Sequence, residues 1–395
     1  MGTVKLAEDV FWVGAVDWDV RDFHGYETRR GTTYNAYLIM DDKTVLVDTV
    51  KYPFKTTLAR NIQELMGPEN LDYLVINHVE IDHASSLSYI MQFAKKATIL
   101  CSRRARDGLA KYYGTNGWNI QTVKTGDELR LGDKTLKFIE APMLHWPDSM
   151  FTYLEEDRIL LPNDAFGQHL ATSQRFDDEV DQALLMEEAA KYYANILMPY
   201  APLIPKKIDE LAVLDVKPRV IAPSHGVIWR HNPEKIVNAY LEWSRGEAKE
   251  KAVIVYDSMW GSTQTMASAI SDGIAKHGIE VRLMHLRRTD HSETMKEILE
   301  AKAVVVGSPT LNSAMFPTVS GFLTYALGLR PKGKVWASFG SYGWGGGALK
   351  AINQRLSESG FEVLEPSLQV QWAPSSDELQ KCREFGEKIA ERIKS

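Results

Sequence analysis

The sequence predicts two domains, a layered α/β or α+β domain followed by a doubly wound parallel sheet. Three observations lead to this prediction. A charged stretch at 241–251, LEWSRGEAKEK, separates two parts of different character. After it, apolar strands alternate regularly with helical patterns, and before it hairpin signals are frequent. We therefore expect an N-terminal domain over residues 1–248 and a C-terminal domain over residues 249–395.

The first part of the chain contains three hairpin signals. MDDKT separates the apolar segments 36–40 and 45–50, and RLGDKTLKF and LEEDRILL repeat the pattern. Helical patterns lie near residues 53–65, 85–94, 103–114, 184–197 and 205–214. Strands mixed with helices in this way predict a layered domain.

The second part alternates strands and helices. Strands are expected at 252–256, 280–286, 303–307, 335–339 and 361–370, and helices at 263–277, 291–300, 317–328, 347–359 and 376–393. Strands separated by helices of this length imply parallel pairing with right-handed crossovers. Five such units match a flavodoxin-like sheet of order 2-1-3-4-5.

Composition excludes several classes of protein. The 395 residues include only two cysteines, Cys101 and Cys382, which excludes a disulfide scaffold and cysteine-ligated zinc or iron–sulfur sites. A formal net charge of −6 does not indicate a nucleic-acid or membrane partner. No apolar run reaches the ~18 residues that span a bilayer, and the N-terminus lacks signal-peptide features. We expect a cytoplasmic protein.

The most informative run is LDYLVINHVEIDHASS. The apolar strand at 73–76 leads into His78, Glu80, Asp82 and His83. Residues two apart in an extended chain point the same way, so His78 and Glu80 can converge on one point. The other two side chains follow as the chain turns toward a second point. Four potential ligands within six residues are typical of a compact metal site.

Three further candidate ligands, His145, Asp164 and His225, each follow an apolar strand. Four histidines and three carboxylates are a natural set for two metal ions with one bridging carboxylate. Nitrogen and oxygen ligands without thiolate suit iron or manganese, and zinc is a third option. A carboxylate-rich, partly open pair favours redox-active iron. Taken singly, each histidine could be structural, and each carboxylate could be a helix cap.

A second candidate site lies in the C-terminal part. Its first segment, between a strand and a helix, consists of Ser258, Met259, Trp260, Gly261, Ser262 and Thr263. Hydroxyls, loop amides and a helix N-terminus form an anion site that suits the phosphate of FMN. The Lys of a Walker loop and the G-x-G-x-x-G of a dinucleotide site are both absent from the segment. Taken alone, the segment could be a simple capped turn.

Two more segments follow the third and fourth strands and would line the same crevice. They are Ser308, Pro309, Thr310, Leu311 and Asn312, and Ser341, Tyr342, Gly343, Trp344, Gly345 and Gly346. In a sheet of order 2-1-3-4-5, the ends of strands 1, 3 and 4 meet at the switch point. The aromatic rings there suit a planar flavin, although they could instead form a subunit contact.

The motif HVEIDH resembles the metallo-β-lactamase-fold motif HxHxDH with Glu80 in place of the second histidine. With HWPDSM, NDAFGQ and SHGVIWR, the chain resembles the A-type flavodiiron proteins. The resemblance implies a metallo-β-lactamase-like αββα sandwich before the flavodoxin-like domain. It also implies the ligands of two irons, with Asp164 bridging: His78, Glu80 and His145 on one iron, and Asp82, His83 and His225 on the other. A crowded second site would leave His83 unligated.

Four other residues need an interpretation. The resemblance places His24 and Tyr26, in RDFHGY, near the diiron pocket, where they would donate protons or hydrogen bonds to bound oxygen. The alternative is an ordered loop. We interpret His169 as a structural residue or as a neighbour of the ligands, and His231 as a surface residue near a helix start.

The pairing of the two sites predicts an oxidase. FMN accepts two electrons and two irons store one each, so together they hold the four electrons that reduce dioxygen to water. The same centre could reduce nitric oxide to nitrous oxide, as a second activity or as the main one. A zinc hydrolase of the metallo-β-lactamase fold with an appended flavodoxin is a weaker alternative. A non-catalytic electron carrier is weaker still.

The resemblance also implies partners. Efficient electron transfer requires close cofactors, so we expect a head-to-tail homodimer, or a dimer of such dimers, with the FMN of one subunit facing the diiron site of the other. No donor module is recognisable in the sequence, so electrons would arrive on a separate molecule. Rubredoxin is the first candidate donor, and a reduced deazaflavin coenzyme is the second.

Overall fold

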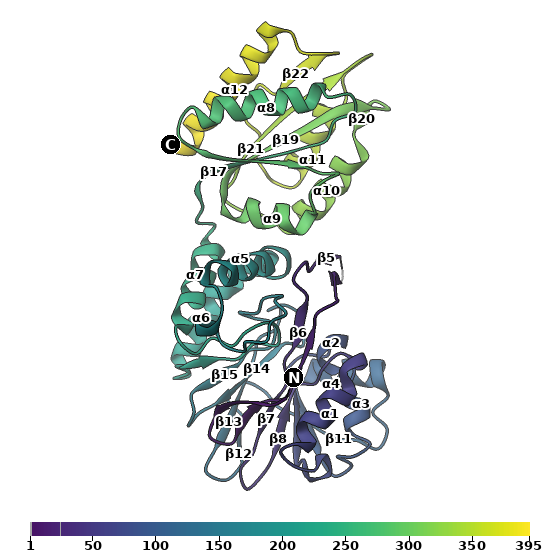
Figure 1. Ribbon diagram of the computed structural model, residues 1–395, viewed down its shortest axis with the longest axis vertical. Coiled ribbons are helices and arrows are strands. Elements are labelled where there is room, and N and C mark those ends of the chain that lie inside the picture. Colours follow the sequence, from purple (N-terminus) through teal and green to yellow (C-terminus); the bar gives the residue numbers. More distant parts are fainter. Residues whose placement is uncertain (1, 24) are drawn as a thin grey trace. The chain divides into compact units, whose positions relative to one another are not determined.

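The protein is described here by a computed structural model that covers residues 2–23 and 25–395 (Figure 1). The chain divides into two compact units. The N-terminal unit comprises Met1–Tyr193 and Tyr200–Leu241, and the C-terminal unit comprises Ala194–Pro199 and Glu242–Ser395. The domain boundary between residues 248 and 249 stays a prediction. None of the helices formed by the described residues has the length and hydrophobicity to cross a bilayer.

Two sheets form the centre of the N-terminal unit. The first has seven strands in the order β1-β2-β7-β8-β9-β10-β11 and the second has five in the order β12-β13-β14-β15-β16. The strands of the first sheet are Val4–Ala7, Val10–Trp12, Tyr37–Ile39, Val45–Val47, Tyr73–Ile76, Thr98–Cys101 and Asn119–Thr122. Those of the second are Glu128–Arg130, Thr135–Glu140, Met150–Leu154, Ile159–Leu161 and Val220–Ile221. Two short pairs are separate: β3 (Ala15–Asp17) with β6 (Thr32–Tyr34), and β4 (Asp22–Phe23) with β5 (Tyr26–Glu27).

Helices cover the outer faces of these sheets. They are α1 (Lys55–Gln63), α2 (Ile81–Ala84), α3 (Leu87–Ile90), α4 (Arg103–Tyr113), α5 (Gln182–Tyr192), α6 (Ile204–Val213) and α7 (Pro233–Arg245). Buried residues of α1, α3 and α4 share one core with the first sheet, and a second core, including Trp12 and Phe138, joins the two sheets. Figure 1 shows α6 and α7 beside β14 and β15. The αββα sandwich is therefore confirmed.

The three predicted hairpins are all present. Each is antiparallel: β7 with β8, β12 with β13, and β14 with β15. The helix expected at 85–94 is shorter, and α2 precedes it with a break at Ser85 and Ser86. Helix α7 begins close to His231, where a helix start was expected, and Pro233 at its first position is a recognised start signal.

The C-terminal unit is the doubly wound sheet. Its order, β18-β17-β19-β21-β22, is 2-1-3-4-5 in chain order, and all four pairings are parallel. The strands are Lys249–Tyr256 (β17), Glu280–His285 (β18), Ala301–Leu311 (β19), Val335–Tyr342 (β21) and Leu368–Gln371 (β22), with β20 (Ala314–Met315) paired to β19. The predicted topology is confirmed.

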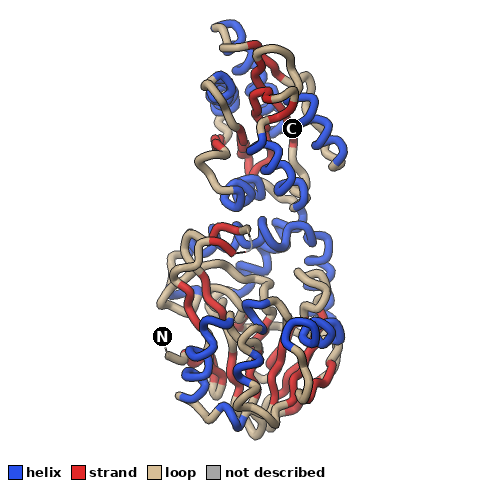
Figure 2. The backbone as a smooth tube through the Cα atoms, turned by 90° about the vertical axis from the view of Figure 1, so that its right-hand side faces the viewer, coloured by secondary structure: helices blue, strands red, loops and turns tan. Residues whose placement is uncertain are grey.

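Helices pack on both faces of this sheet (Figure 2). They are α8 (Ser262–Ala275), α9 (His291–Glu300), α10 (Pro317–Gly328), α11 (Ala348–Glu358) and α12 (Ser376–Lys394). Helices α8 and α12 cross closely, because a Cβ on Gly273 would lie 2.0 Å from the Arg383 carbonyl oxygen. A Cβ on Gly386 would lie 2.2 Å from the Ile270 carbonyl oxygen. Glycine at both positions permits the contact.

The largest differences between the predicted and the observed strands of this unit are at β22 and β19. The strand expected over 361–370 is limited to Leu368–Gln371. Pro366 has no N–H to donate to a ladder, and Leu364 N instead bonds the Trp336 carbonyl outside a regular strand. Strand β19 runs to Leu311, beyond the expected residue 307, because its end forms a hairpin with β20.

Candidate functional site

Two groups of histidine and carboxylate side chains lie at the strand ends of the N-terminal unit. The first is His78, Glu80, His145 and Asp164, and the second is Asp82, His83 and His225. Within each group, the candidate ligand atoms all lie within 4.8 Å of one another. The structure therefore brings together every residue that was predicted to bind metal.

The sandwich positions these side chains on rigid strand ends. The preceding strands are β9 for His78, β13 for His145, β15 for Asp164 and β16 for His225. Glu80 precedes α2, and Asp82 and His83 lie within it. Because β9 is parallel to β8 and β10, and β15 is parallel to β16, ligands that follow these strands meet at one edge.

The carboxylate of Asp164 lies between the two groups. Its Oδ2 atom is 3.2 Å from His145 Nε2 and 3.9 Å from His78 Nε2. Its Oδ1 atom is 3.1 Å from His83 Nε2 and 3.4 Å from His225 Nε2. Each oxygen thus faces a different group, which is the arrangement that a bridging ligand requires.

The spacing within each group fits a metal ion. Glu80 Oε2 lies 3.2 Å from His78 Nε2 and 3.4 Å from His145 Nε2. Asp82 Oδ2 lies 3.0 Å from His225 Nε2 and 3.3 Å from His83 Nε2. Ligands bound at the usual ~2.1 Å from a metal are separated by roughly 3.0–3.4 Å in tetrahedral or octahedral geometry.

Several polar atoms in these groups are buried without a hydrogen bond. Among the described residues, these are both oxygens of Asp82, both ring nitrogens of His83 and Oδ2 of Asp164. All three side chains are less than a tenth exposed. Burying such atoms without partners costs free energy that metal coordination would recover. The donor set of imidazole and carboxylate fits iron, manganese or zinc.

In the metal-free groups, the pKa values of Asp164 and His225 depend strongly on the charges of their neighbours. Burial disfavours the charged form of Asp164, but the neighbouring imidazoles of His83 and His145 hold the pKa of Asp164 well below its ordinary value. Burial lowers the pKa of His225, yet the adjacent carboxylates of Asp164 and Asp82 outweigh it and raise the pKa to about 10. In the metal-free protein His225 therefore favours its protonated, positively charged form.

Residues outside the two groups orient the ligands. His78 Nδ1 donates to Asp148 Oδ2 at 2.9 Å, and the same oxygen accepts from Val79 N at 2.9 Å. His225 Nδ1 donates to the Thr33 carbonyl at 2.7 Å. In both histidines the Nε2 atom is therefore directed toward the candidate metal position, as outer-shell partners commonly achieve.

Several residues that contact the ligands or their neighbours were not predicted from the sequence, among them Asp148, Asp48 and Tyr192. Asp148 lies in the motif HWPDSM, which supports the family resemblance but did not identify Asp148 as a residue of the site. Asp48 accepts from Asn77 N at 2.8 Å and from Asn163 Nδ2 at 3.2 Å, and these asparagines precede His78 and Asp164. Tyr192 OH donates to Asp164 Oδ1 at 3.0 Å. Asp48 follows the apolar strand β8, a signal that could have identified it.

The other histidines of this unit differ in their surroundings. His169 is buried, its Nδ1 lies 2.8 Å from Thr32 Oγ1, and its ring centroid is 4.9 Å from that of His225. His231 is exposed just before α7, as expected. His24 lies outside the described residues. Tyr26 is buried in β5 with its ring 5.0 Å from that of His169, and its role stays a prediction.

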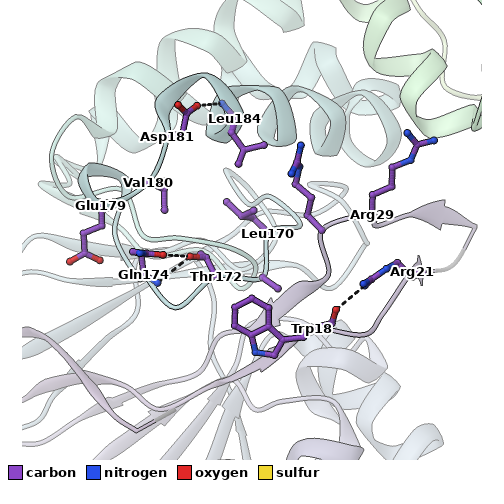
Figure 3. Close-up of a pocket in the computed structure, with 12 residues that line it drawn as sticks. Trp18, Arg21, Arg29, Leu170, Thr172, Gln174, Glu179, Val180, Asp181 and Leu184 are labelled. Atoms are coloured by element: carbon purple, nitrogen blue, oxygen red, sulfur yellow. Dashed lines mark hydrogen bonds between the residues drawn. The ribbon is translucent and has the colours of Figure 1, made fainter.

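Among the cavities lined by described residues, two on the N-terminal unit are relevant to the site. The one of about 230 Å³ reaches the candidate ligands, and its lining is Asp22, Phe23, Lys51, Glu80, Ile81, Asp82, Tyr112 and Trp146. The other, of about 560 Å³, is drawn in Figure 3 with Trp18, Arg29 and Leu170 on its walls. None of the side chains drawn there belongs to a predicted site. Of these two cavities, the smaller one is therefore the one lined by candidate metal ligands, Glu80 and Asp82.

The predicted phosphate segment lies between β17 and α8. Gly261 has φ +93°, and its N–H donates to Ser258 Oγ at 3.1 Å. Ser262 begins α8. Thr263 Oγ1 lies 2.9 Å from Ser341 Oγ, which joins this segment to the end of β21. The segments after the first and fourth strands of the sheet thus meet, as predicted.

The remaining predicted flavin residues are distributed around this point. Ser308, Pro309, Thr310 and Leu311 form the end of β19, and Asn312 lies in the turn to β20. Tyr342 ends β21, and Gly343, Trp344, Gly345 and Gly346 lie between it and α11.

Exposed aromatic rings mark the same edge of the sheet. Trp260 and Trp344 are almost fully exposed, and the apolar side chain of Met259 beside them is 41% exposed. Trp372 follows β22, is 70% exposed, and was missed although it occupies the same kind of position as the other two tryptophans. Large apolar side chains left in water mark a binding surface, and a planar flavin ring would cover them. The residues present fit FMN.

The comparisons with known proteins agree with this architecture. Residues 32–226 match the family described as "ODP family beta lactamase", and residues 254–386 match "Flavodoxin". A protein of Moorella thermoacetica named nitric oxide reductase is 54% identical over 99% of this chain and 98% of its own length.

Two solved structures are also similar over nearly their full length. The rubredoxin oxygen:oxidoreductase from Desulfovibrio gigas has TM-score 0.97 and 39% identity, with coverage of 99% of this chain and 98% of the other. The flavodiiron protein from Giardia intestinalis has TM-score 0.96 and 35% identity, with coverage of 100% and 97%. This chain is an oxidoreductase and belongs to the flavodiiron protein family.

Proposed function

We propose that this oxidoreductase reduces dioxygen to water, with nitric oxide as a second substrate. The observation that carries the proposal is the position of Asp164, whose two oxygens face two separate histidine and carboxylate groups. The cofactors of the protein are those of its family, FMN and a non-haem diiron site. Held by these residues, FMN would supply one- and two-electron transfer, and the diiron site would supply the redox centre for the gas.

The residues of this chain support that chemistry in three ways. The two groups would hold two cations, and Asp164 presents one oxygen to each group. The cavity beside Glu80 and Asp82 admits a diatomic gas to one side of the pair. The hydrogen bonds from His78 to Asp148 and from His225 to Thr33 keep the ligands in one orientation.

The electron count favours dioxygen as the main substrate. Reducing one dioxygen to two waters takes four electrons and four protons, which matches the capacity of FMN and two irons together. Reducing two nitric oxide molecules to nitrous oxide and one water takes two of each. The name of the Moorella thermoacetica relative favours nitric oxide as the second substrate. Membership of an oxidoreductase family decides against the zinc hydrolase.

The test is anaerobic stopped-flow mixing of the reduced protein with each gas. We expect flavin reoxidation by dioxygen to be faster than by nitric oxide at equal concentration. The control is Asp164→Asn, which should retain FMN and lose fast reoxidation by nitric oxide. Faster oxidation of the wild type by nitric oxide than by dioxygen would reverse the proposed order of substrates.

The partners and the location stay predictions. Rubredoxin is the first donor to test, since the name of the Desulfovibrio gigas relative includes it, and a reduced deazaflavin coenzyme is the second. The head-to-tail homodimer predicts that a monomerised variant keeps both cofactors and loses turnover. Full turnover by such a monomer would overturn it. A cytoplasmic location also stays a prediction.

A further inference from the structure

The predicted phosphate segment, residues 258–263, contains no cationic side chain, and a carboxylate lies directly before it. Asp257 is the last residue ahead of the segment and is fully buried. An ionised carboxylate next to a bound phosphate would repel it, because like charges interact strongly where water is excluded. The Asp257 carboxylate therefore needs a positive charge from elsewhere in the C-terminal unit if the segment is to receive a phosphate.

The contacts of Asp257 show where that charge comes from. Its Oδ1 atom accepts from Arg287 Nε at 2.8 Å and lies 3.3 Å from His285 Nε2. Its Oδ2 atom accepts from Thr318 Oγ1 at 2.5 Å. Burial raises the pKa of Asp257, but the hydrogen bond from Thr318 and the other donors hold the pKa below its ordinary value. The carboxylate is ionised and is paired with a guanidinium.

Arg287 also holds the phosphate segment directly. A second nitrogen of its guanidinium donates to the Ser258 carbonyl, while Ser258 N donates to Asp257 Oδ1 at 2.6 Å. The Arg287 side chain is 49% exposed, and its guanidinium lies 5.6 Å from the centroid of the Phe316 ring. One arginine thus neutralises the buried carboxylate and fixes the first peptide of the segment.

We propose that Asp257 and Arg287 are positioning residues for the FMN phosphate, with Arg287 cancelling the Asp257 charge and fixing the segment that receives the phosphate. The inference rests on the proposed flavin site. It assigns opposite electrostatic effects to the two residues. Loss of Arg287 alone leaves the Asp257 charge beside the phosphate without its guanidinium partner, whereas loss of both charges removes the repulsion.

The test is fluorescence titration of the deflavinated full chain with FMN and with riboflavin, which lacks the phosphate. We expect Arg287→Gln to weaken FMN binding about tenfold and riboflavin binding less than about twofold, because the added repulsion acts on the phosphate. The double variant Asp257→Asn with Arg287→Gln should recover at least half of the lost FMN affinity on a logarithmic scale. Arg287→Lys keeps the positive charge, so its ratio of FMN affinity to riboflavin affinity should stay near that of the wild type.

The matched control is Arg288→Gln, which removes the same charge from the adjacent exposed residue. It should change neither affinity. Equal loss of FMN and riboflavin affinity in Arg287→Gln would overturn the inference, and so would a double variant no better than that single variant. A wild-type chain that binds neither flavin would overturn the proposed flavin site itself, and the inference with it.

Discussion

His78 Nδ1 lies 2.9 Å from Asp148 Oδ2, on the side of the ring opposite to Asp164. The carboxylate also accepts the Val79 N–H, so one side chain fixes both the ring and the backbone beside it. Outer-shell carboxylates of this kind orient a histidine and increase its basicity as a ligand. Asp148 should therefore govern metal affinity without touching the metal.

We predict that Asp148→Asn weakens iron binding by about 10- to 100-fold, since the amide cannot accept both donors as strongly. Competition with a chromophoric chelator measures this. The control is Asp107→Asn, an exposed aspartate with an ion pair to Arg106 on α4, which should bind iron as the wild type does. Wild-type iron affinity in Asp148→Asn would show that the contact does not orient the ligand.

Asp164 should be more important for metal loading than any ligand of a single group. Because its two oxygens face different groups, Asp164→Ala removes a ligand from both. We expect this variant to retain almost no iron, and Glu80→Gln to retain part of the complement. Iron analysis after gel filtration compares the two. If the first variant kept more iron than the second, Asp164 would not be a bridge.

Metal affinity should rise with pH. The pKa of His225 is about 10 in the metal-free protein, above its ordinary value of 6.5, so metal must displace its proton at neutral pH. Affinity for Co²⁺ should increase about tenfold per pH unit for each proton displaced between pH 6 and 8. Calorimetry in two buffers of different ionisation enthalpy counts these protons. An affinity that is constant over this range would contradict the charge states described here.

The same shift has a consequence for the metal-free fold. Because the pKa of His225 is higher in the folded than in the unfolded chain, its contribution to stability is complete below pH 6.5 and is lost as the pH rises to about 10. Metal loading and metal-free stability should therefore respond to pH in opposite directions. Thermal unfolding with and without metal at several pH values checks this.

A buried lysine should stabilise the flavodoxin-like sheet. Lys251 is 2% exposed, and its Nζ atom lies 2.5 Å from Glu297 and 3.1 Å from Glu300. We expect Lys251→Met to lower the unfolding free energy of this domain by about 3 kcal/mol, since it leaves Glu297 buried without this partner. Urea unfolding followed by tryptophan fluorescence measures the loss.

The matched control for this prediction lies on the same strand. Lys249 pairs with Glu300 at 2.9 Å, but its side chain is 69% exposed. Lys249→Met should cost less than about 1 kcal/mol, because an exposed ion pair is screened by water. Similar losses in the two variants would show that burial does not set the strength of these ion pairs.

Much of both sites could be predicted because the relevant residues follow apolar strands. His78, His145, Asp164 and His225 each come within five residues of a strand end, and a sandwich brings such ends to one edge. The sheet order of the C-terminal unit likewise follows from the regular alternation of strands and helices. Local patterns of this kind can be recognised in the sequence because each depends only on a short segment of the chain.

Other features could not be predicted because they depend on distant segments. Nothing near Asp148 in the sequence shows that it would meet His78, seventy residues earlier. The pairing of Asp257 with Arg287 depends on β17 and β18 lying side by side. The end of β19 is extended only because β20 returns to pair with it.

The sequence by itself determined the kind of chemistry: histidines and carboxylates without cysteine ligands, and a hydroxyl-rich segment ahead of a helix. Only the tertiary structure decided how these groups are oriented and which charges are paired. It placed one oxygen of Asp164 toward each group and supplied Arg287 to a segment that has no cation of its own. The physical reason is that ligand types are a property of residues, whereas their distances and charge partners are set by packing.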